Sequence, residues 1–451
     1  MASAVSEGVA GSRRVPPLWW LLPACVWYAL LLCAGGGGLT APVPHGLVFN
    51  SMALHLLHGQ FDVDPAAIGD EGYLRDGLVY AYFGIFPALS RMLLLPLAEF
   101  ATTDFTRVAC LSAVAVMALF KVLSVELVAR RAAAANGALV TLLLVVILAG
   151  GAQIEFLRPS IFQEVGLWAA AWAAVFVYLF LRGWSGDAGF SPRLMSAMAA
   201  VAGMCLLTRV STALGLYLAL GFLWLVVVWR DRRWRQVAPI AILLGFAAMA
   251  GAINLARWGN PLVFADLSRA LIGARFPDRL ARLHRYGEFN LARLPFGLSY
   301  YLFPIWALPE LIWTGFRDRM FDSVELPPAS FLVSDPLLVA LAVYGAIDTA
   351  RRRDRLVLPV LLGFLVPIGL MLTAISLTFR YRLEFYPFLE LAAFVGFAHV
   401  AGMRRGWLAV GAVVSVVMAQ AMWVLTMLSP FGPVQSVVGP AGVAAFYRGL
   451  F

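Results

Sequence analysis

The stretch RVACLSAVAVMALFKVLSVELVARR, residues 107–131, decides the structural class of this chain. Residues 107–129 form a mostly apolar run, long enough as a helix to cross about 30 Å of hydrocarbon. The run ends at Arg130 and Arg131, a basic pair of the kind that marks the cytoplasmic end of a membrane-spanning helix. The stretch therefore predicts a transmembrane helix.

Similar apolar runs recur along the rest of the sequence. They cover residues 17–37, 137–152, 161–181, 194–208, 211–229, 237–256, 336–350, 357–376, 385–402 and 407–428. The composition agrees, because 62% of the residues are hydrophobic and 13% are charged, whereas soluble domains average about 45–50% and about 25%. We predict an all-α polytopic membrane protein with about eleven transmembrane helices, folded as one membrane-embedded domain over residues 1–451.

The first run follows Arg13 and Arg14, an arrangement that also occurs in cleaved secretory signals. We expect an uncleaved first span, because the run is long enough to cross the membrane and the segment LLLCAGGGG is a weak cleavage signal.

The basic residues predict the orientation of the helices. If residues 38–105 form one large non-cytoplasmic loop, the basic clusters all fall on the opposite side, which places the N-terminus in the cytoplasm and the C-terminus outside. These clusters are Arg13/Arg14, Arg130/Arg131, Arg182/Arg193, Arg230/Arg232/Arg233/Arg235, Arg351/Arg352/Arg353/Arg355 and Arg404/Arg405. A span at residues 80–100 would move the later clusters to the wrong face, so we expect a surface helix there.

This topology concentrates the other polar residues outside, chiefly in loop 38–105 and in a second long loop, 257–335. The net charge of +9 lies mostly in short loops between apolar runs, which argues against nucleic-acid binding. The four cysteines lie within apolar stretches, where packing as small hydrophobes is the expected role.

The first loop carries candidate catalytic carboxylates in the segment GQFDVDPAAIGDEGYLRDGLVY, residues 59–80. An acid near the membrane surface can deprotonate an acceptor hydroxyl, and two acids together can bind a divalent cation. We select Asp64 first, then Asp62 and Asp76, from a cluster that also contains Asp70 and Glu71. Asp62 and Asp64 are the candidate ligands if a cation is bound; solvated loop acids are the alternative.

Arginines at the predicted outer helix ends form a second group of candidates: Arg158, Arg209, Arg380 and Arg382. Basic residues are usually enriched at the cytoplasmic ends of spanning helices, so arginines at the outer ends need an explanation. Phosphate binding is one, because a guanidinium matches phosphate oxygens well. We expect them to bind a lipid-linked phosphate, with snorkelling to headgroups as the alternative. Glu164 lies near the outer end of its helix and needs a partner, for which Arg158 is the candidate.

Several segments resemble the GT-C superfamily of integral-membrane glycosyltransferases, in particular the protein O-mannosyltransferase and aminoarabinose-transferase-like group. The segments are YAYFGIFPALSRMLLLP before the second span, QIEFLRPSIFQEVGLW, LLTRVSTALGLYLAL, NLARWGNPLVF and RYRLEFYPFLELAAF. The resemblance spans nearly the whole chain. It implies a GT-C-like fold with surface helices in the first loop and a polyprenyl-phosphate-linked sugar as donor.

The resemblance also bears on individual residues. Arg380 and Arg382 match a segment that this group uses near the lipid phosphate, and we expect Glu164, Tyr82, Tyr381 and His45 to support the site. The group usually has an Asp-Glu pair directly after the first span. The matching stretch here, PVPHGLVFNSM, offers His45 and Asn50 but no carboxylate, so a base must come from elsewhere.

The leading hypothesis is a bacterial inner-membrane glycosyltransferase that moves a sugar from a polyprenyl-phosphate carrier to a glycan, lipid or protein acceptor on the non-cytoplasmic face. Membrane lipids are expected partners, nucleic acids are not, and no cofactor is indicated except the divalent cation left open above. Two alternatives stand beside it: a transporter or flippase of an amphiphile, and a non-catalytic GT-C-like lipid-binding scaffold.

Overall fold

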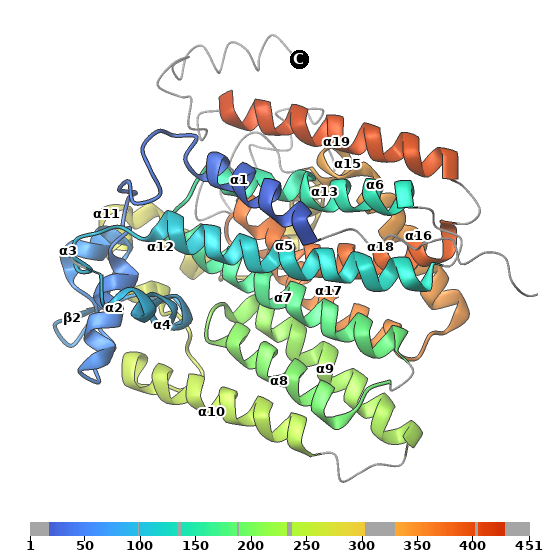
Figure 1. Cartoon of the computed structure of the whole chain (residues 1–451). Helices are drawn as coiled ribbons and strands as arrows, with labels where there is room; N and C mark the ends of the chain where they lie inside the picture. Colours follow the sequence, from blue (N-terminus) through green and yellow to red (C-terminus); the bar gives the residue numbers. More distant parts are fainter. Residues whose placement is uncertain are drawn as a thin grey trace, which may run out of the picture.

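The computed structural model of the chain describes residues 18–97, 99–132, 137–186, 189–231, 237–302, 330–401 and 405–428. Figure 1 shows long helices running side by side in one bundle, with short elements gathered at one end. The basic residues Arg13, Arg14, Arg232, Arg233, Arg235 and Arg404, and both chain ends, lie outside the described residues.

Eleven helices of the bundle coincide with the predicted apolar runs. They are α1 (Leu21–Leu32), α5 (Thr106–Arg131), α6 (Gly137–Leu148), α7 (Ile161–Ser185), α8 (Pro192–Leu206), α9 (Val210–Asp231), α10 (Ala238–Trp258), α16 (Pro336–Arg352), α17 (Val357–Thr373), α18 (Tyr386–Val400) and α19 (Arg405–Leu428). The 3-10 helix η1 (Leu18–Trp20) precedes α1, and η4 (Gly151–Leu157) continues α6.

Six of these helical segments, within the described ranges, are long and apolar enough to cross a membrane: Thr106–Arg131, Gly137–Leu157, Ile161–Ser185, Val210–Arg230, Ala238–Trp258 and Gly406–Leu428. The other five are shorter, at 12 residues for α1, 15 for α8 and α18, and 17 for α16 and α17. The all-helical membrane class is confirmed, but eleven spans stay a prediction.

Close helix packing in the bundle depends on small residues. A Cβ atom on Gly345 of α16 would lie 1.9 Å from the carbonyl oxygen of Ala392 in α18, and one on Gly396 would lie 2.4 Å from the carbonyl oxygen of Leu341. Only glycine permits this approach. Such contacts are a main source of helix association in a bilayer, because lipid tails are as apolar as the side chains they surround.

The predicted first loop folds into short elements between α1 and α5. They are α2 (Val48–Leu57), α3 (Pro65–Ile68), η2 (Gly69–Glu71), β1 (Tyr73–Arg75), β2 (Leu78–Tyr80), α4 (Phe86–Arg91) and η3 (Met92–Leu94). Strands β1 and β2 pair antiparallel in the register Tyr73↔Tyr80. The surface helix expected at residues 80–100 is confined to the short helices α4 and η3.

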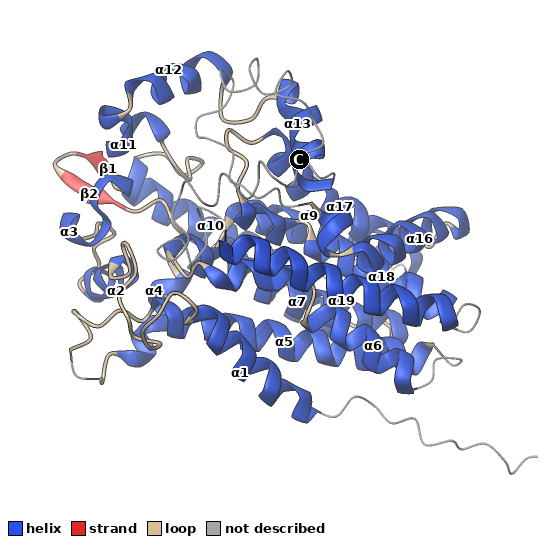
Figure 2. Ribbon diagram, turned by 90° about the horizontal axis from the view of Figure 1, so that it is seen from above, coloured by secondary structure: helices blue, strands red, loops and turns tan. Residues whose placement is uncertain are grey.

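The second long segment, between α10 and α16, packs at the same end of the bundle. Its described elements are η5 (Leu267–Arg269), α11 (Leu271–Arg275), α12 (Pro277–Tyr286), η6 (Leu291–Arg293), α13 (Leu294–Leu302) and α15 (Phe331–Ser334). Figures 1 and 2 both show α2, α3 and the hairpin close to α11 at this end. A third short element, η8 (Phe379–Glu384), links α17 to α18.

The basic ends of α5 and α16 lie at the opposite end of the bundle. Arg131 at the end of α5 donates to the carbonyl oxygen of Trp184 in α7 over 2.9 Å. The Trp184 indole in turn donates to Asp354, which follows the basic end of α16. The helix directions therefore separate a basic end from the end that carries the two long segments, as the charge pattern predicts.

Candidate active site

A cavity of about 780 Å³ lies at the loop-bearing end of the bundle. Segments far apart in the sequence form its wall: the first loop, the start of α7, the turn between α8 and α9, the end of α10, the segment after it, and the link from α17 to η8. Cavities of this size accommodate small-molecule ligands or the head portion of larger ones.

The first loop is fastened to this wall at two points. The amide of Phe86 donates to the carbonyl oxygen of Leu207 over 2.9 Å, and a Cβ atom on Gly84 would lie 2.1 Å from that same oxygen, so the loop passes close against the α8–α9 turn. The amide of Leu271 donates to the carbonyl oxygen of Gly72 over 2.9 Å, which ties the hairpin to α11. The adjoining Glu71 is thereby held on the cavity wall.

Two arginines and a tyrosine form the most polar part of the lining. The guanidinium carbons of Arg209 and Arg380 lie 5.5 and 5.6 Å from the centre of the Tyr381 ring. Arg380 also lies over Phe162 at 4.4 Å. All four residues line the cavity, so two cations face it with their positions set by aromatic rings.

A buried carboxylate fixes Arg209. Glu384 is 1% exposed and accepts from the Arg209 Nε over 2.5 Å. The hydroxyls of Ser211 and Thr212 donate to the two Glu384 oxygens over 2.5 and 2.6 Å. This network keeps the Arg209 guanidinium in one orientation at the cavity wall, and Glu384 was not among the predicted site residues.

Two carboxylates line the same cavity, Glu71 from the first loop and Glu288 from the second. Glu71 is half-buried, and it interacts electrostatically with the cavity tyrosines Tyr73 and Tyr82. Partial burial, with the charge of Asp266 as a smaller cause, raises the pKa of Glu288. A carboxyl with a raised pKa gains or loses its proton closer to neutral pH, which suits proton transfer.

Tyr82 connects the carboxylate and arginine parts of the lining. Burial raises the pKa of Tyr82 to about 12, although the nearby Arg380 and Arg209 act to lower it. The hydroxyl therefore keeps its proton at neutral pH and can donate a hydrogen bond.

Arg257 is a third cation on the lining and was not a predicted site residue. It is 2% exposed, and it donates from Nη1 to the carbonyl oxygen of Phe83 over 2.7 Å. It lies near the end of α10, in the segment NLARWGNPLVF. The sequence therefore contained a signal for it, namely an arginine at the outer end of an apolar run.

The three predicted catalytic acids lie away from the cavity lining. Asp62 pairs with His55 over 3.2 Å, and the Asp64 side chain accepts from the amide of Ala66 and caps α3. Asp76 occupies the hairpin turn at a φ of 53°, where it is exposed and pairs with Arg75. These contacts give all three acids local structural roles, and the first-loop acid on the cavity wall is Glu71 instead.

Arg382, expected at the phosphate site, is fully buried away from the cavity lining. Its Nη2 donates to Asp335 over 2.8 Å, to Ser334 over 2.6 Å and to the hydroxyl of Tyr386 over 3.1 Å. Asp335 also accepts from the amide of Gly151. The network joins the starts of α16 and α18 to η4, which is a packing role.

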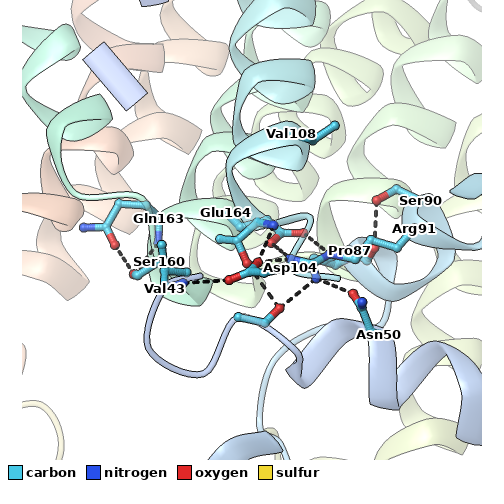
Figure 3. A network of polar contacts seen from close by, with 12 residues as sticks. Val43, Asn50, Pro87, Ser90, Arg91, Asp104, Val108, Ser160, Gln163 and Glu164 are labelled. Atoms are coloured by element: carbon cyan, nitrogen blue, oxygen red, sulfur yellow. Dashed lines mark hydrogen bonds and ion pairs between the residues drawn. The ribbon is translucent and has the colours of Figure 1, made fainter. Parts of the chain in front are cut away.

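The predicted partner of Glu164 was wrong. Glu164 pairs with Arg91 of α4, not with Arg158, in a buried network that Figure 3 shows. Arg91 also donates to Asn50 over 2.5 Å and to Thr106 over 2.9 Å. This network fixes the first loop to α5 and α7.

The stretch after the first span has a structural role as well. Asn50 donates to the carbonyl oxygens of Phe100 and Thr103 over 2.6 and 2.7 Å. His45 adopts a positive φ of 60° beside Gly69, where a Cβ atom would lie 3.3 Å from the imidazole. Neither residue lines the cavity, and neither does Arg158, which ends η4.

No cluster of three or more His, Cys, Asp or Glu side chains suited to a metal ion occurs in the described part of the chain. Asp62 and Asp64, the predicted ligands, are engaged by His55 and by α3 as described above. A cation bound by these two residues stays a prediction.

Comparison with known proteins gives a match in fold only. No protein-family model matches the chain, and neither does any curated protein. Among solved structures, the apo crystal structure of the Archaeoglobus fulgidus oligosaccharyltransferase is similar, with a TM-score of 0.50 and 14% identity over 96% of this chain and 60% of that one. Its complex with Zn and sulfate gives a TM-score of 0.51 and 13% identity over 96% and 57%.

This chain thus spans about 60% of the length of the enzyme it matches. At such identities the likeness concerns the fold alone.

Proposed function

We propose that this chain is a membrane glycosyltransferase that moves a sugar from a polyprenyl-phosphate-linked donor to an acceptor at the loop-bearing end of the bundle. The observation that carries the proposal is that Arg209, Arg380 and Tyr381 line one large cavity together with the carboxylates Glu71 and Glu288 at that end. The GT-C-like fold agrees with it.

The reaction follows from these groups. An acceptor hydroxyl gives its proton to a carboxylate, and its oxygen attacks the anomeric carbon of the sugar while the bond from that carbon to the phosphate oxygen breaks. Negative charge then grows on the departing polyprenyl phosphate. Fixed guanidinium groups stabilise that charge more in the transition state than in the ground state, which accelerates the reaction. Arg380 and Arg209 take this role.

Glu71 is the proposed base. It comes from the first loop, as the sequence analysis expected of the base, and it interacts with Tyr82, which also interacts with Arg380 and Arg209. We propose that this base and the phosphate-binding arginines act on opposite sides of one sugar. The more exposed Glu288 lies on the wall formed by the second loop.

We infer the orientation from the basic end of the bundle. We place Arg130, Arg131 and Arg351–Arg353 in the cytoplasm, and the cavity on the non-cytoplasmic side of the inner membrane. Lipid-linked sugars reach such a site within the membrane, while a glycan, lipid or protein acceptor approaches from the aqueous side.

The test is donor consumption in membranes that contain the full chain, supplied with synthetic short-chain polyprenyl-phosphate sugars. Glu71→Gln is expected to slow the release of polyprenyl phosphate by about 10²–10⁴-fold, the usual range for general-base catalysis. Asp64→Asn is the matched control, because Asp64 lies in the same loop but off the cavity lining, and it should release polyprenyl phosphate at the wild-type rate.

Two outcomes would contradict the assignment. Loss of turnover in Asp64→Asn with full activity in Glu71→Gln would return the base to Asp64. Wild-type membranes that consume none of the donors beyond control membranes would favour the scaffold or transporter alternatives.

A further inference from the structure

The third cation of the cavity, Arg257, has no role in the reaction described above. Its side chain is almost fully buried, with 2% exposed, and it lies near the end of α10, a predicted span. Its Nη1 donates to the Phe83 carbonyl oxygen over 2.7 Å, and its Nη2 lies 3.6 Å from the sulfur of Met52.

These neutral contacts do not compensate the charge of Arg257. In the described ranges no carboxylate lies within ion-pair distance of it, and its Nε has no hydrogen-bond partner. Three other deeply buried cations are matched by acids: Arg91 by Glu164, Arg382 by Asp335 and Lys121 by Glu390. Arg293 and Arg107 donate to main-chain carbonyl oxygens instead, but both lie off the cavity lining. An uncompensated buried cation costs several kcal/mol, so its presence in a cavity wall points to an anionic ligand group.

Arg257 is separated from the arginines assigned to the leaving phosphate. Arg380 lies over the ring of Phe162 at 4.4 Å, and that ring contacts the ring of Phe83 at 5.6 Å. Arg257 binds the main chain of Phe83. The path of contacts from Arg257 to Arg380 therefore runs through Phe83 and Phe162.

We propose that Arg257 is a specificity residue that binds a second oxyanion, a carboxylate or phosphate carried by the sugar-bearing substrate and distinct from the leaving phosphate. The proposal rests on the glycosyltransferase function above and adds that the transferred sugar or the acceptor is acidic. Asn254, three residues earlier on α10, also lines this part of the cavity and can contribute its amide.

The experiment measures binding of small probes to the full chain in detergent by calorimetry. Methyl glucuronide carries a carboxylate and glucose 6-phosphate a phosphate, while methyl glucoside is the neutral reference. Inorganic phosphate and pyrophosphate report on the linkage to the lipid. We expect wild-type protein to bind at least one acidic sugar about tenfold or more tightly than methyl glucoside, as desolvated charge pairs typically do.

Variants assign the effect. Arg257→Gln should abolish the preference for the acidic sugar but keep binding of inorganic phosphate, whereas Arg380→Gln should weaken phosphate binding and keep the preference. Arg75→Gln is the matched control, because Arg75 contacts the same end of α10 through the Ala256 carbonyl oxygen but does not line the cavity. It should change neither result.

Wild-type protein without preference for either acidic sugar overturns the proposal, whatever the variants do. A preference that survives Arg257→Gln, or one lost in Arg380→Gln, overturns it too. A third result also rejects an acidic sugar: no preference for either acidic sugar, together with tighter binding of pyrophosphate than of phosphate that disappears in Arg257→Gln. That result would assign Arg257 to the phosphate linkage of the donor. Phosphate binding insensitive to Arg380→Gln would instead count against the glycosyltransferase site itself.

Discussion

Arg380 and Arg382 lie two residues apart in η8, yet one lines a cavity and the other is fully buried beside an acid. Arg382 is fully buried and donates to Asp335, Ser334 and Tyr386. Arg380 lines a cavity of about 780 Å³, where its guanidinium lies over Phe162 and beside Tyr381.

The contrast shows how a membrane protein uses the same residue type for two purposes. A cation matched by a buried acid stabilises the packing of particular helices, while a cation on a cavity wall can bind a ligand anion. The two arginines are distinguishable by experiment, because replacing Arg382 should affect folding and replacing Arg380 should affect turnover.

The largest effect is expected for Arg382→Met. The substitution leaves the Asp335 carboxylate buried without its cation, which costs about 3–5 kcal/mol in comparable cases. Thermal unfolding in detergent should show a large fall in unfolding temperature and a low yield of monodisperse protein. The double variant Arg382→Met/Asp335→Asn should recover much of the loss; a stable single variant would contradict the packing role.

Arg380→Met should act in the opposite way. Removing one preorganised cation from the leaving phosphate is expected to slow turnover by about 10²–10³-fold. The unfolding temperature should stay close to that of wild type, because Arg380 lies on the cavity wall and is not fully buried. A variant that unfolds early and turns over normally would mean that both arginines serve packing.

Glu384→Gln sharpens the comparison within the cavity. Arg209 is held by Glu384, so replacing this acid leaves the charge of Arg209 uncompensated. The freed charge of Arg209 should then attract phosphate more strongly. We expect inorganic phosphate to bind several-fold more tightly, since two unit charges about 4 Å apart attract each other by about 1 kcal/mol in water. Titration calorimetry gives the affinity, and Ser211→Ala serves as a control that keeps the charge. An unchanged affinity would exclude Arg209 from the phosphate site, whereas a lower affinity would mean that the orientation Glu384 gives to Arg209 outweighs the released charge.

The smallest effect concerns pH and Glu288. Burial raises the pKa of Glu288 in the folded chain above its ordinary value of 4.5. Ionisation of this group therefore opposes folding: the penalty is absent at low pH, appears as the pH rises past 4.5, and is complete above the folded pKa. Glu288→Gln should match wild type in unfolding temperature at acid pH and exceed it slightly at neutral pH. An equal difference at all pH values would contradict the raised pKa.

The fold could be predicted from the sequence because apolar runs and basic loop residues respond to the bilayer directly. Each predicted run contains a helix, and the basic ends of α5 and α16 meet as the charge pattern requires. Helix length was less predictable, because lengths of 12–17 residues in α1, α8, α16, α17 and α18 depend on how neighbours pack.

The site was only partly predictable. Arg209, Arg380, Tyr82 and Tyr381 were named from the sequence and lie together on the cavity lining, although their roles stay predictions. Which acid of the first loop lines the cavity, Glu71 or Asp64, depends on the direction of each side chain. The order of acids in the sequence does not determine that direction.

Partners between distant segments were not predictable at all. Glu164 pairs with Arg91, 73 residues away, and Arg382 with Asp335, 47 residues away. Such pairs depend on tertiary packing, which sequence proximity does not report.

The most direct test of the central claim is native mass spectrometry of the purified full chain in mild detergent, with wild type compared with Arg380→Met. Wild type is expected to retain a polyprenyl-phosphate sugar, either copurified or added as a synthetic donor, and the variant is expected to lose it while remaining folded. Retention of the same lipid by both proteins, or only bulk phospholipid on wild type after donor is added, would contradict the assignment of this cavity to a lipid-linked sugar.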